Sequence, residues 1–347
     1  MQKQRNYSMD IFRFVAALFV VVCHVDFLKE AADGIYQFVA RFSPRVSVSF
    51  FFAISGYYYI NALLEDKKIF KKQFFSLVKV YACWSVIYYA ASFVVNIVLD
   101  HGDIKTFLIE RVVFFLTKGS YSHFWYFPAL IYSVVLATCF HKFFGKKGIH
   151  ILTILSLFLF VLANLGSSYF PIGMKIPGLN QFITNREVYE VLRGILGMGL
   201  PYFMIGYVLY CMKNIIENVS SKTLWILLGV GVALYFGEIF LLSNVLKWYE
   251  YPEVFLMLYP LTVVIMILLI RNPKPEWQPH AATMKRLSGY IYYVHPLCIL
   301  VLEVLAGMLS IYIPSVVMYV LVVGFAILSG LLLLNMSRKL KWISNFI

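Results

Sequence analysis

Three ionisable side chains interrupt the first apolar stretch of the chain. Asp10, Arg13 and His24 lie within the run from Met9 to Leu28. Ionisable groups inside a membrane span are costly enough to be treated as functional candidates. An imidazole can take up or relay a proton near neutral pH, and a guanidinium can hold anionic oxygens. We therefore expect this stretch to combine a proton-transfer group with a cation.

The spacing of these residues places them on one face of a helix. At about 100° per residue, the interval from Arg13 to His24 completes about three turns, and Asp10 lies within about 40° of the same line. At about 1.5 Å per residue, Arg13 and His24 are about 16 Å apart along the axis. We expect both groups to face one buried polar channel. The alternative is a helix end with a snorkelling arginine and an interfacial histidine.

The composition indicates which class of protein positions these groups. Hydrophobic residues make up 61% of the chain and charged residues 14%, with a mean hydropathy of +0.78. Soluble domains contain about 45–50% apolar residues. The chain is therefore predicted to be an all-α polytopic membrane bundle in the lipid bilayer, a single integral membrane domain over residues 1–347. Because ionisable groups lie in the first span and no small-residue cleavage site follows it, we do not expect a removable signal peptide.

The apolar stretches predict about ten membrane-spanning helices. They are Met9 to Leu28, Arg45 to Leu64, Phe74 to Leu99, a span from His123 to the turn at His141, Ile149 to Leu165, Arg193 to Leu209, Thr223 to Leu242, Glu253 to Ile270, a span beginning at Ser288, and Pro314 to Met336. Ser55 and Gly56 form a small pair among aromatic residues in the second span, which favours close helix packing.

The net charge of +13 is explained by membrane topology. With a cytoplasmic N-terminus, 20 of the 30 Lys and Arg residues lie on the cytoplasmic side, as the positive-inside rule requires. Both termini are then cytoplasmic, and the expected location is the bacterial plasma membrane. The cations occupy short connections rather than one soluble face, so no nucleic-acid partner is expected. The five cysteines are scattered without metal-ligand spacing, which predicts neither a disulfide framework nor a metal site.

Further candidate residues lie in or next to later spans. Arg193 opens a stretch with three glycines and Pro201, which predicts a helix broken at depth beside a cavity. Glu238 is predicted to be buried near the outer end of its span, either as a site carboxylate or as a charge paired with Lys247. Trp125 is either a ligand contact or an interfacial belt residue.

His295 lies in mid-span, directly before Pro296. It is either a site residue or a packed histidine that donates to a carbonyl freed by the proline. The longest predicted outer loop, Gly166 to Leu192, has a length that is often functional.

Several segments together resemble a known family. The stretch from Arg13 to His24, the segment from Arg45 through SFFFAISGYYY, and GYIYYVHP resemble the acyltransferase family 3 membrane proteins over nearly the whole chain. The segments SHFWYFPALIYS and RGILGMGLPYFMIGYVL resemble the branch that includes the membrane domain of vancomycin-resistance serine racemases.

The resemblance implies transfer of an acyl group, commonly acetyl from cytosolic acetyl-CoA, to a hydroxyl of an extracytoplasmic or exported carbohydrate or cell-envelope polymer. It implies that His24 is the catalytic imidazole and that Arg13 belongs to the same site. The shared helix face adds Asp10 to the catalytic candidates. The remaining assigned residues are Arg13, Lys71, Lys72 and Lys79 for the phosphates of CoA, and Arg45, Trp125, Arg193 and His295 for the acceptor.

Two positions depart from the family's pattern. Many members have two arginines three residues apart at the start of the third span, where this chain has Ser76 and Lys79. The sugar-modifying branch has a glutamate where this chain has Leu130, so either Glu238 or Asp26 supplies the carboxylate or the chemistry differs.

The resemblance leaves other functions open. The racemase membrane domains are associated with serine supply across the membrane, and broken helices near buried charges also suit a transporter of a serine-like amino acid or sugar. A third alternative is a non-catalytic partner in an envelope-polymer assembly.

Overall fold

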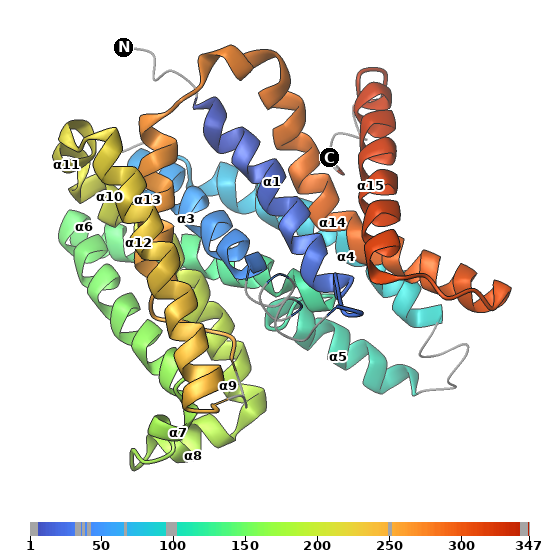
Figure 1. Cartoon of the computed structure of the whole chain (residues 1–347), viewed down its shortest axis with the longest axis horizontal. Helices are drawn as coiled ribbons and strands as arrows, with labels where there is room; N and C mark the ends of the chain where they lie inside the picture. The colour runs from blue at the N-terminus through green and yellow to red at the C-terminus, as the bar shows by residue number, and fades with distance from the viewer. Residues whose placement is uncertain are drawn as a thin grey trace. The chain divides into compact units, whose positions relative to one another are not determined.

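The computed structural model describes residues 6–31, 36, 39, 43–65, 68–94, 103–248, 252–340 and 346, and these are helical without a strand. The described chain divides into two compact units. The first unit comprises residues 1–51 and 272–347, and the second comprises residues 52–271. Helix α3 (Ser43–Leu64) contains the boundary between them. Figure 1 shows the helices in chain order.

Eight of the described helices are long and apolar enough to cross a membrane, and α13 (Leu258–Arg271) is a shorter apolar helix. This confirms the prediction of a polytopic helical bundle and a multi-pass membrane protein. The ten predicted spans all fall on helices, and the fourth and fifth share α6 (Tyr126–Leu165). The part of the third predicted span beyond Val94 extends into residues outside the described ones.

In the first unit, α1 (Tyr7–His24) packs along α14 (Gln278–Leu309), and α14 packs on α15 (Ser315–Ser337) (Figure 1). The side chain of Asn6 caps α1 by accepting a hydrogen bond from the Met9 N–H. The predicted end of this span at Leu28 is wrong. The helix ends at His24, and the chain then turns through Asp26 and Leu28, which have φ angles of 49° and 64°.

Hydrogen bonds of Glu30 link the segment after α1 to the start of α15. Its carboxylate accepts hydrogen bonds from the Tyr312 hydroxyl at 2.7 Å, the Ser315 N–H at 2.9 Å and the Ser315 hydroxyl. These hydrogen bonds lower the pKa of Glu30 to about 2. A carboxylate at a helix N-terminus satisfies backbone N–H groups that have no partner within the helix.

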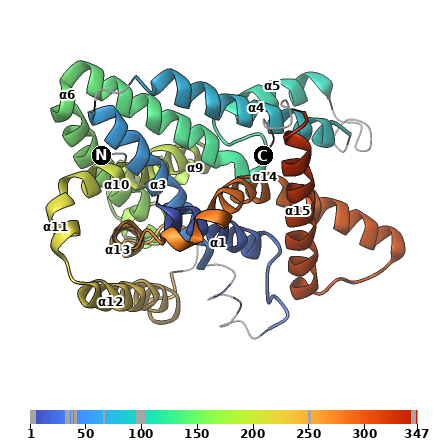
Figure 2. The same cartoon turned by 90° about the horizontal axis from the view of Figure 1, so that it is seen from above.

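Figure 2 shows the helices from above. The short 3₁₀ helix η6 (Pro275–Trp277) also belongs to the first unit, and the second unit contains the other described helices. In addition to α6 and α13 they are α4 (Phe70–Phe93), α5 (Ile104–Leu116), η3 (Ser122–Trp125), α7 (Phe170–Gly173), α8 (Leu179–Thr184), α9 (Arg186–Leu192), η4 (Arg193–Gly199), α10 (Leu200–Cys211), α11 (Lys213–Asn218), α12 (Ser221–Phe240) and η5 (Leu241–Val245). Helix α6 packs against η4 and α10, and α12 packs against α13.

Gly145 divides α6 into two helical segments. Its backbone has φ 59° and ψ −145°, a conformation that residues with a Cβ rarely adopt. The two segments correspond to the fourth and fifth predicted spans.

Close packing of α3 on α10 confirms the expectation for the small pair in the second span. A Cβ added to Gly56 would collide with the backbone of Phe203, and one added to Gly206 would collide with the backbone of Gly56. The two backbones touch because neither glycine has a side chain.

The predicted break in the sixth span is wrong. Residues from Arg193 to Gly199 form the π-helix η4, which continues directly from α9 into α10. Two of its glycines allow close packing on α6, since added Cβ atoms at Gly197 and Gly199 would meet Ala163 and Ala129. Pro201 lies in the first turn of α10 and, inside this continuous helix, has no N–H with which to donate a backbone hydrogen bond.

Candidate functional site

Two imidazoles lie together in the first unit. The ring of His24 at the end of α1 and the ring of His295 on α14 have centroids 4.8 Å apart. His295 is fully buried, and its Nδ1 lies 3.0 Å from the Ile291 carbonyl oxygen. Because a carbonyl oxygen can only accept, Nδ1 carries the proton and donates it, which leaves the lone pair of the neutral ring on Nε2. The pair can therefore accept and pass on a proton.

An ion pair lies in the first turns of the same helix. The Arg13 Nη1 donates to Asp10 Oδ1 at 2.9 Å, and the Asp10 side chain is 3% exposed. Helix α1 thus holds a cation one turn from a buried carboxylate and carries an imidazole at its far end. The continuous polar channel between Arg13 and His24 remains a prediction.

Arg45 also belongs to the first unit, in the first turns of α3. Its charge acts on Cys23, the residue before His24. The first unit therefore contains five of the predicted site residues, Asp10, Arg13, His24, Arg45 and His295, of which Asp10 and Arg13 form one pair and His24 and His295 another.

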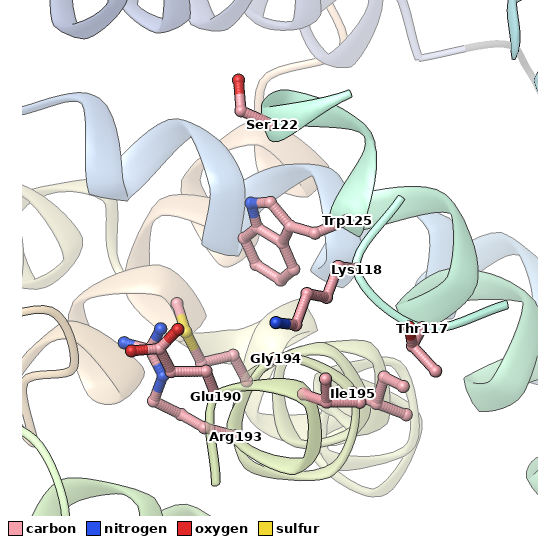
Figure 3. A pocket seen from close by; sticks show the side chains of 10 residues that line it. Thr117, Lys118, Ser122, Trp125, Glu190, Arg193, Gly194 and Ile195 are labelled. Atoms are coloured by element: carbon pink, nitrogen blue, oxygen red, sulfur yellow. The ribbon is translucent and has the colours of Figure 1, made fainter. Parts of the chain in front are cut away.

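A cavity of about 250 Å³ lies in the second unit (Figure 3). The turn after α5 and η3 form one wall, and α9 and η4 form the other. The indole of Trp125 and the backbone of Gly194 approach closely, since a Cβ added to Gly194 would lie 3.4 Å from the Trp125 ring. The lining residues are Thr117, Lys118, Ser122, Trp125, Glu190, Val191, Arg193, Gly194, Ile195 and Met198.

The charges around this cavity differ in their pairing. Arg193 forms an ion pair with Glu253, and Glu190 lies 3.5 Å from Arg186. Lys118 instead lies 5.6 Å from the centroid of the Phe114 ring, and no carboxylate in the described ranges forms a salt bridge with it. In Figure 3 its ammonium group lies between the Trp125 ring and the side chains of Glu190 and Arg193.

The structure brings together two residues predicted from the sequence, Trp125 and Arg193, and adds three that sequence reasoning missed. Lys118, Ser122 and Glu190 also line the cavity. Glu190 precedes Arg193 by one helical turn, and Ser122 precedes Trp125 by the same interval. In both cases a polar residue lies one turn before a predicted site residue, at the predicted outer end of a span. This spacing could have indicated from the sequence that Glu190 and Ser122 belong to the same site.

Glu238 is buried near the C-terminal end of α12, which is the end predicted to be outer, and its carboxylate is held by a local network. It accepts hydrogen bonds from the Tyr169 hydroxyl at 2.7 Å and from the Leu256 and Met257 N–H groups at 2.8 Å each. Burial, together with the Glu238 carboxylate, raises the pKa of Tyr169.

The alternative pairing of Glu238 with Lys247 is wrong for the part of the chain that the structure describes. The network anchors the segment that leads into α13. A catalytic role for Glu238 remains a prediction.

The predicted phosphate-binding lysines lie on α4. Lys71, Lys72 and Lys79 are all exposed. Lys72, Ser76 and Lys79 follow the i, i+4, i+7 spacing of one helix face, so two of the cations lie along one stripe. Leu130, at the position where a carboxylate is missing, is buried in α6.

Comparison with known proteins gives matches over nearly the whole chain. The family model described as an acyltransferase domain matches residues 6–335. An amino-acid racemase of Enterococcus faecalis is 26% identical over 98% of this chain and 47% of its own length. A serine/alanine racemase of Enterococcus gallinarum is 26% identical over 97% of this chain and 47% of its own length. The chain thus spans about half the length of these curated relatives. No solved structure matches it.

Proposed function

The chain belongs to the acyltransferase family 3 membrane proteins, and on that premise we propose that it is a membrane-bound O-acyltransferase. It transfers an acyl group, acetyl in the simplest case, from cytosolic acyl-CoA to a hydroxyl of an extracytoplasmic or exported carbohydrate or cell-envelope polymer. The observation that carries this proposal is the contact between the imidazoles of His24 and His295.

In the proposed reaction, His24 takes the proton from the acceptor hydroxyl as its oxygen attacks the thioester carbonyl carbon. A carbon–oxygen bond forms and the carbon–sulfur bond breaks, and the proton then passes to the departing CoA thiolate. His295 acts as a positioning or relay group. Its Nδ1–H is held by the Ile291 carbonyl, so its Nε2 can accept a proton.

The donor is proposed to be held through its phosphates by Arg13, Lys71, Lys72 and Lys79. The exposed lysine stripe on α4 suits this role because ammonium groups bind phosphate as point charges. The buried Asp10 fixes the position of the Arg13 guanidinium through its hydrogen bond.

The acceptor is proposed to bind in the cavity beside Trp125. With a cytoplasmic N-terminus, the residues of both cavity walls lie in predicted outer loops or directly after them. The cavity is therefore expected on the extracytoplasmic side of the membrane. An indole face offers apolar contact to a sugar ring, while the Ser122 hydroxyl and the Glu190 carboxylate offer hydrogen bonds.

The experiment that tests this function uses purified protein in proteoliposomes with radiolabelled acetyl-CoA and a panel of hydroxylated acceptors. We expect acetyl transfer by the native protein and a loss of about 100-fold or more in His24→Ala, the range for removal of a general base. His280→Ala is the matched control, since His280 is exposed at the start of α14. Transfer that is unaffected by His24→Ala would reject the mechanism.

A second candidate is transport of a small polar substrate such as a serine-like amino acid or sugar. It is favoured by the π-helical backbone of η4 along the cavity, because π-helical turns occur frequently at functional sites. Uptake of labelled serine or sugar into proteoliposomes, in the absence of acetyl-CoA, separates the two functions. No uptake of any tested amino acid or sugar would count against transport.

A further inference from the structure

Helix α5 has one anchored face and one open apolar face. On the anchored face, the Phe115 ring stacks on Tyr81 of α4 at 4.3 Å, and the Tyr89 hydroxyl donates to the Arg111 carbonyl at 2.7 Å. The open face carries six large apolar side chains, each between 49% and 64% exposed: Ile104, Leu108, Ile109, Val112, Val113 and Leu116. A helix of this kind lies at a membrane interface with its apolar face against acyl chains.

The open face of α5 leads directly into the cavity. Leu116 ends the helix, and Thr117 and Lys118 are cavity-lining residues. Gly119, with φ 88°, makes the turn that follows, and its N–H donates to the Phe114 carbonyl at 2.7 Å. A Cβ at Gly119 would collide with backbone atoms of Phe124 and Trp125, so the turn requires glycine.

Lys118 therefore lies at the border between an apolar surface and a polar cavity. It is exposed and has no salt-bridge partner in the described ranges, whereas Arg193 and Glu190 on the opposite wall are paired. An uncompensated ammonium at an interface attracts phosphate or another anionic headgroup. The order along this wall is thus an apolar face, a single cation and an aromatic cavity.

We propose that the acceptor is an anionic lipid with a hydroxylated headgroup, bound so that the headgroup lies against Trp125, the phosphate against Lys118 and the acyl or prenyl tail along the open face of α5. That the bound lipid accepts the acyl group rests on the proposed function, whereas binding of the lipid does not depend on acyl transfer. A free carbohydrate would use the cavity alone and gain nothing from the six apolar side chains.

The test uses the full chain in phosphatidylcholine nanodiscs that contain a small fraction of phosphatidylglycerol with a photoactivatable diazirine in one acyl tail. After illumination, adducts are mapped by mass spectrometry. We expect them to concentrate on residues 104–116 and to fall about fivefold in Lys118→Gln, the effect of one lysine at an anionic lipid surface. Trp125→Ala should reduce them as well. Lys175→Gln, which removes an exposed cation that lies neither on α5 nor in the lining of the cavity, should leave them unchanged.

Two outcomes would overturn the proposal. Labelling of α5 that is equal in the native protein, Lys118→Gln and Trp125→Ala would mean that only ordinary surrounding lipid is detected. Competition by soluble glycerol 1-phosphate as effective as that by unlabelled phosphatidylglycerol would mean that the cavity does not recognise the tail. Selective labelling without acetyl transfer in the enzyme assay would leave this inference standing and reject the proposed function.

Discussion

The ion pair of Asp10 and Arg13 has both a structural and a proposed functional role, and substitutions can separate the two. Arg13→Gln removes the guanidinium that pairs with the buried Asp10 carboxylate, which should lower the free energy of unfolding by about 3–5 kcal/mol. In the double variant Asp10→Asn/Arg13→Gln, both charges are absent, and most of the stability should return.

Donor binding should not return in the double variant, because the guanidinium is still missing. Thermal unfolding in detergent and isothermal titration with CoA measure the two properties on the same preparations. If CoA affinity recovers together with stability, Arg13 is an anchor for the helix and not a phosphate ligand.

The carboxylate of Glu30 predicts a defined pH dependence of stability. Its pKa is lowered from 4.5 to about 2 by hydrogen bonds at the start of α15. A lowered pKa in the folded state means that this stabilisation is fully present above about pH 4.5 and is lost as the pH falls towards 2. Glu30→Gln should therefore reduce the melting temperature at pH 7 and pH 5, and the two proteins should converge near pH 2.

Glu303→Gln on α14 is the matched control, because Glu303 is exposed and has no ion pair within the described ranges. A difference between native protein and Glu30→Gln that persists undiminished below pH 3 would contradict the assignment of the effect to this carboxylate.

Individual residue types could be identified from the sequence more readily than their partners. Asp10, Arg13 and His24 are evident because ionisable groups are rare in an apolar run. The contact of His24 with His295 could not be foreseen, since it depends on how α1 packs along α14 from the other end of the chain. The network around Glu238 includes two backbone N–H groups, which no side-chain pattern reveals.

Among the helices, the contact between α3 and α10 is the one most sensitive to an added methyl group. Gly56→Ala would force its Cβ into the Phe203 backbone, which cannot yield as a flexible side chain would. Overpacking of this kind costs about 1–3 kcal/mol. We expect a lower melting temperature in detergent.

Gly229→Ala in α12 is the control, because a Cβ there meets no atom within 4 Å. Helix propensity alone should make that substitution neutral or stabilising by up to about 1 kcal/mol. Equal destabilisation by the two substitutions would contradict the backbone contact between α3 and α10.

The glycine-rich sixth span shows where helix prediction fails and why. Glycine and proline lower helix propensity, so a break is the expected result of their local preferences. In the structure, tertiary packing on α6 uses the glycines as contact points, and the backbone stays helical in π geometry. At Gly145 the sequence predicted a turn between two spans but not the residue that makes it. The positive φ of Gly145 ends the first helical segment of α6 there.

For the whole chain, composition was sufficient to predict a multi-pass helical membrane protein, because 61% hydrophobic residues cannot be buried in a domain of this size without lipid. The distribution of Lys and Arg predicts the orientation. A cavity could not be predicted in the same way, since it results from a turn and a helix that lie far apart in sequence.

The orientation can be tested by labelling single cysteines in a variant without the five native ones. Lys118→Cys should react with a membrane-impermeant maleimide added to intact cells, because the cavity is predicted to be extracytoplasmic. Lys146→Cys, at the basic turn within α6, should react only after the membrane is permeabilised. The reverse pattern would place the acceptor cavity on the donor's side and contradict the proposed reaction.

The proposed reaction requires above all that the acyl donor reach His24 from the side of Arg13. The most direct measurement is a density map of the protein with a non-hydrolysable acetyl-CoA analogue. We expect the phosphates of the analogue at Arg13 and its acyl end against the imidazole of His24. Density for the analogue in a place where its acyl end does not contact His24 would contradict the account.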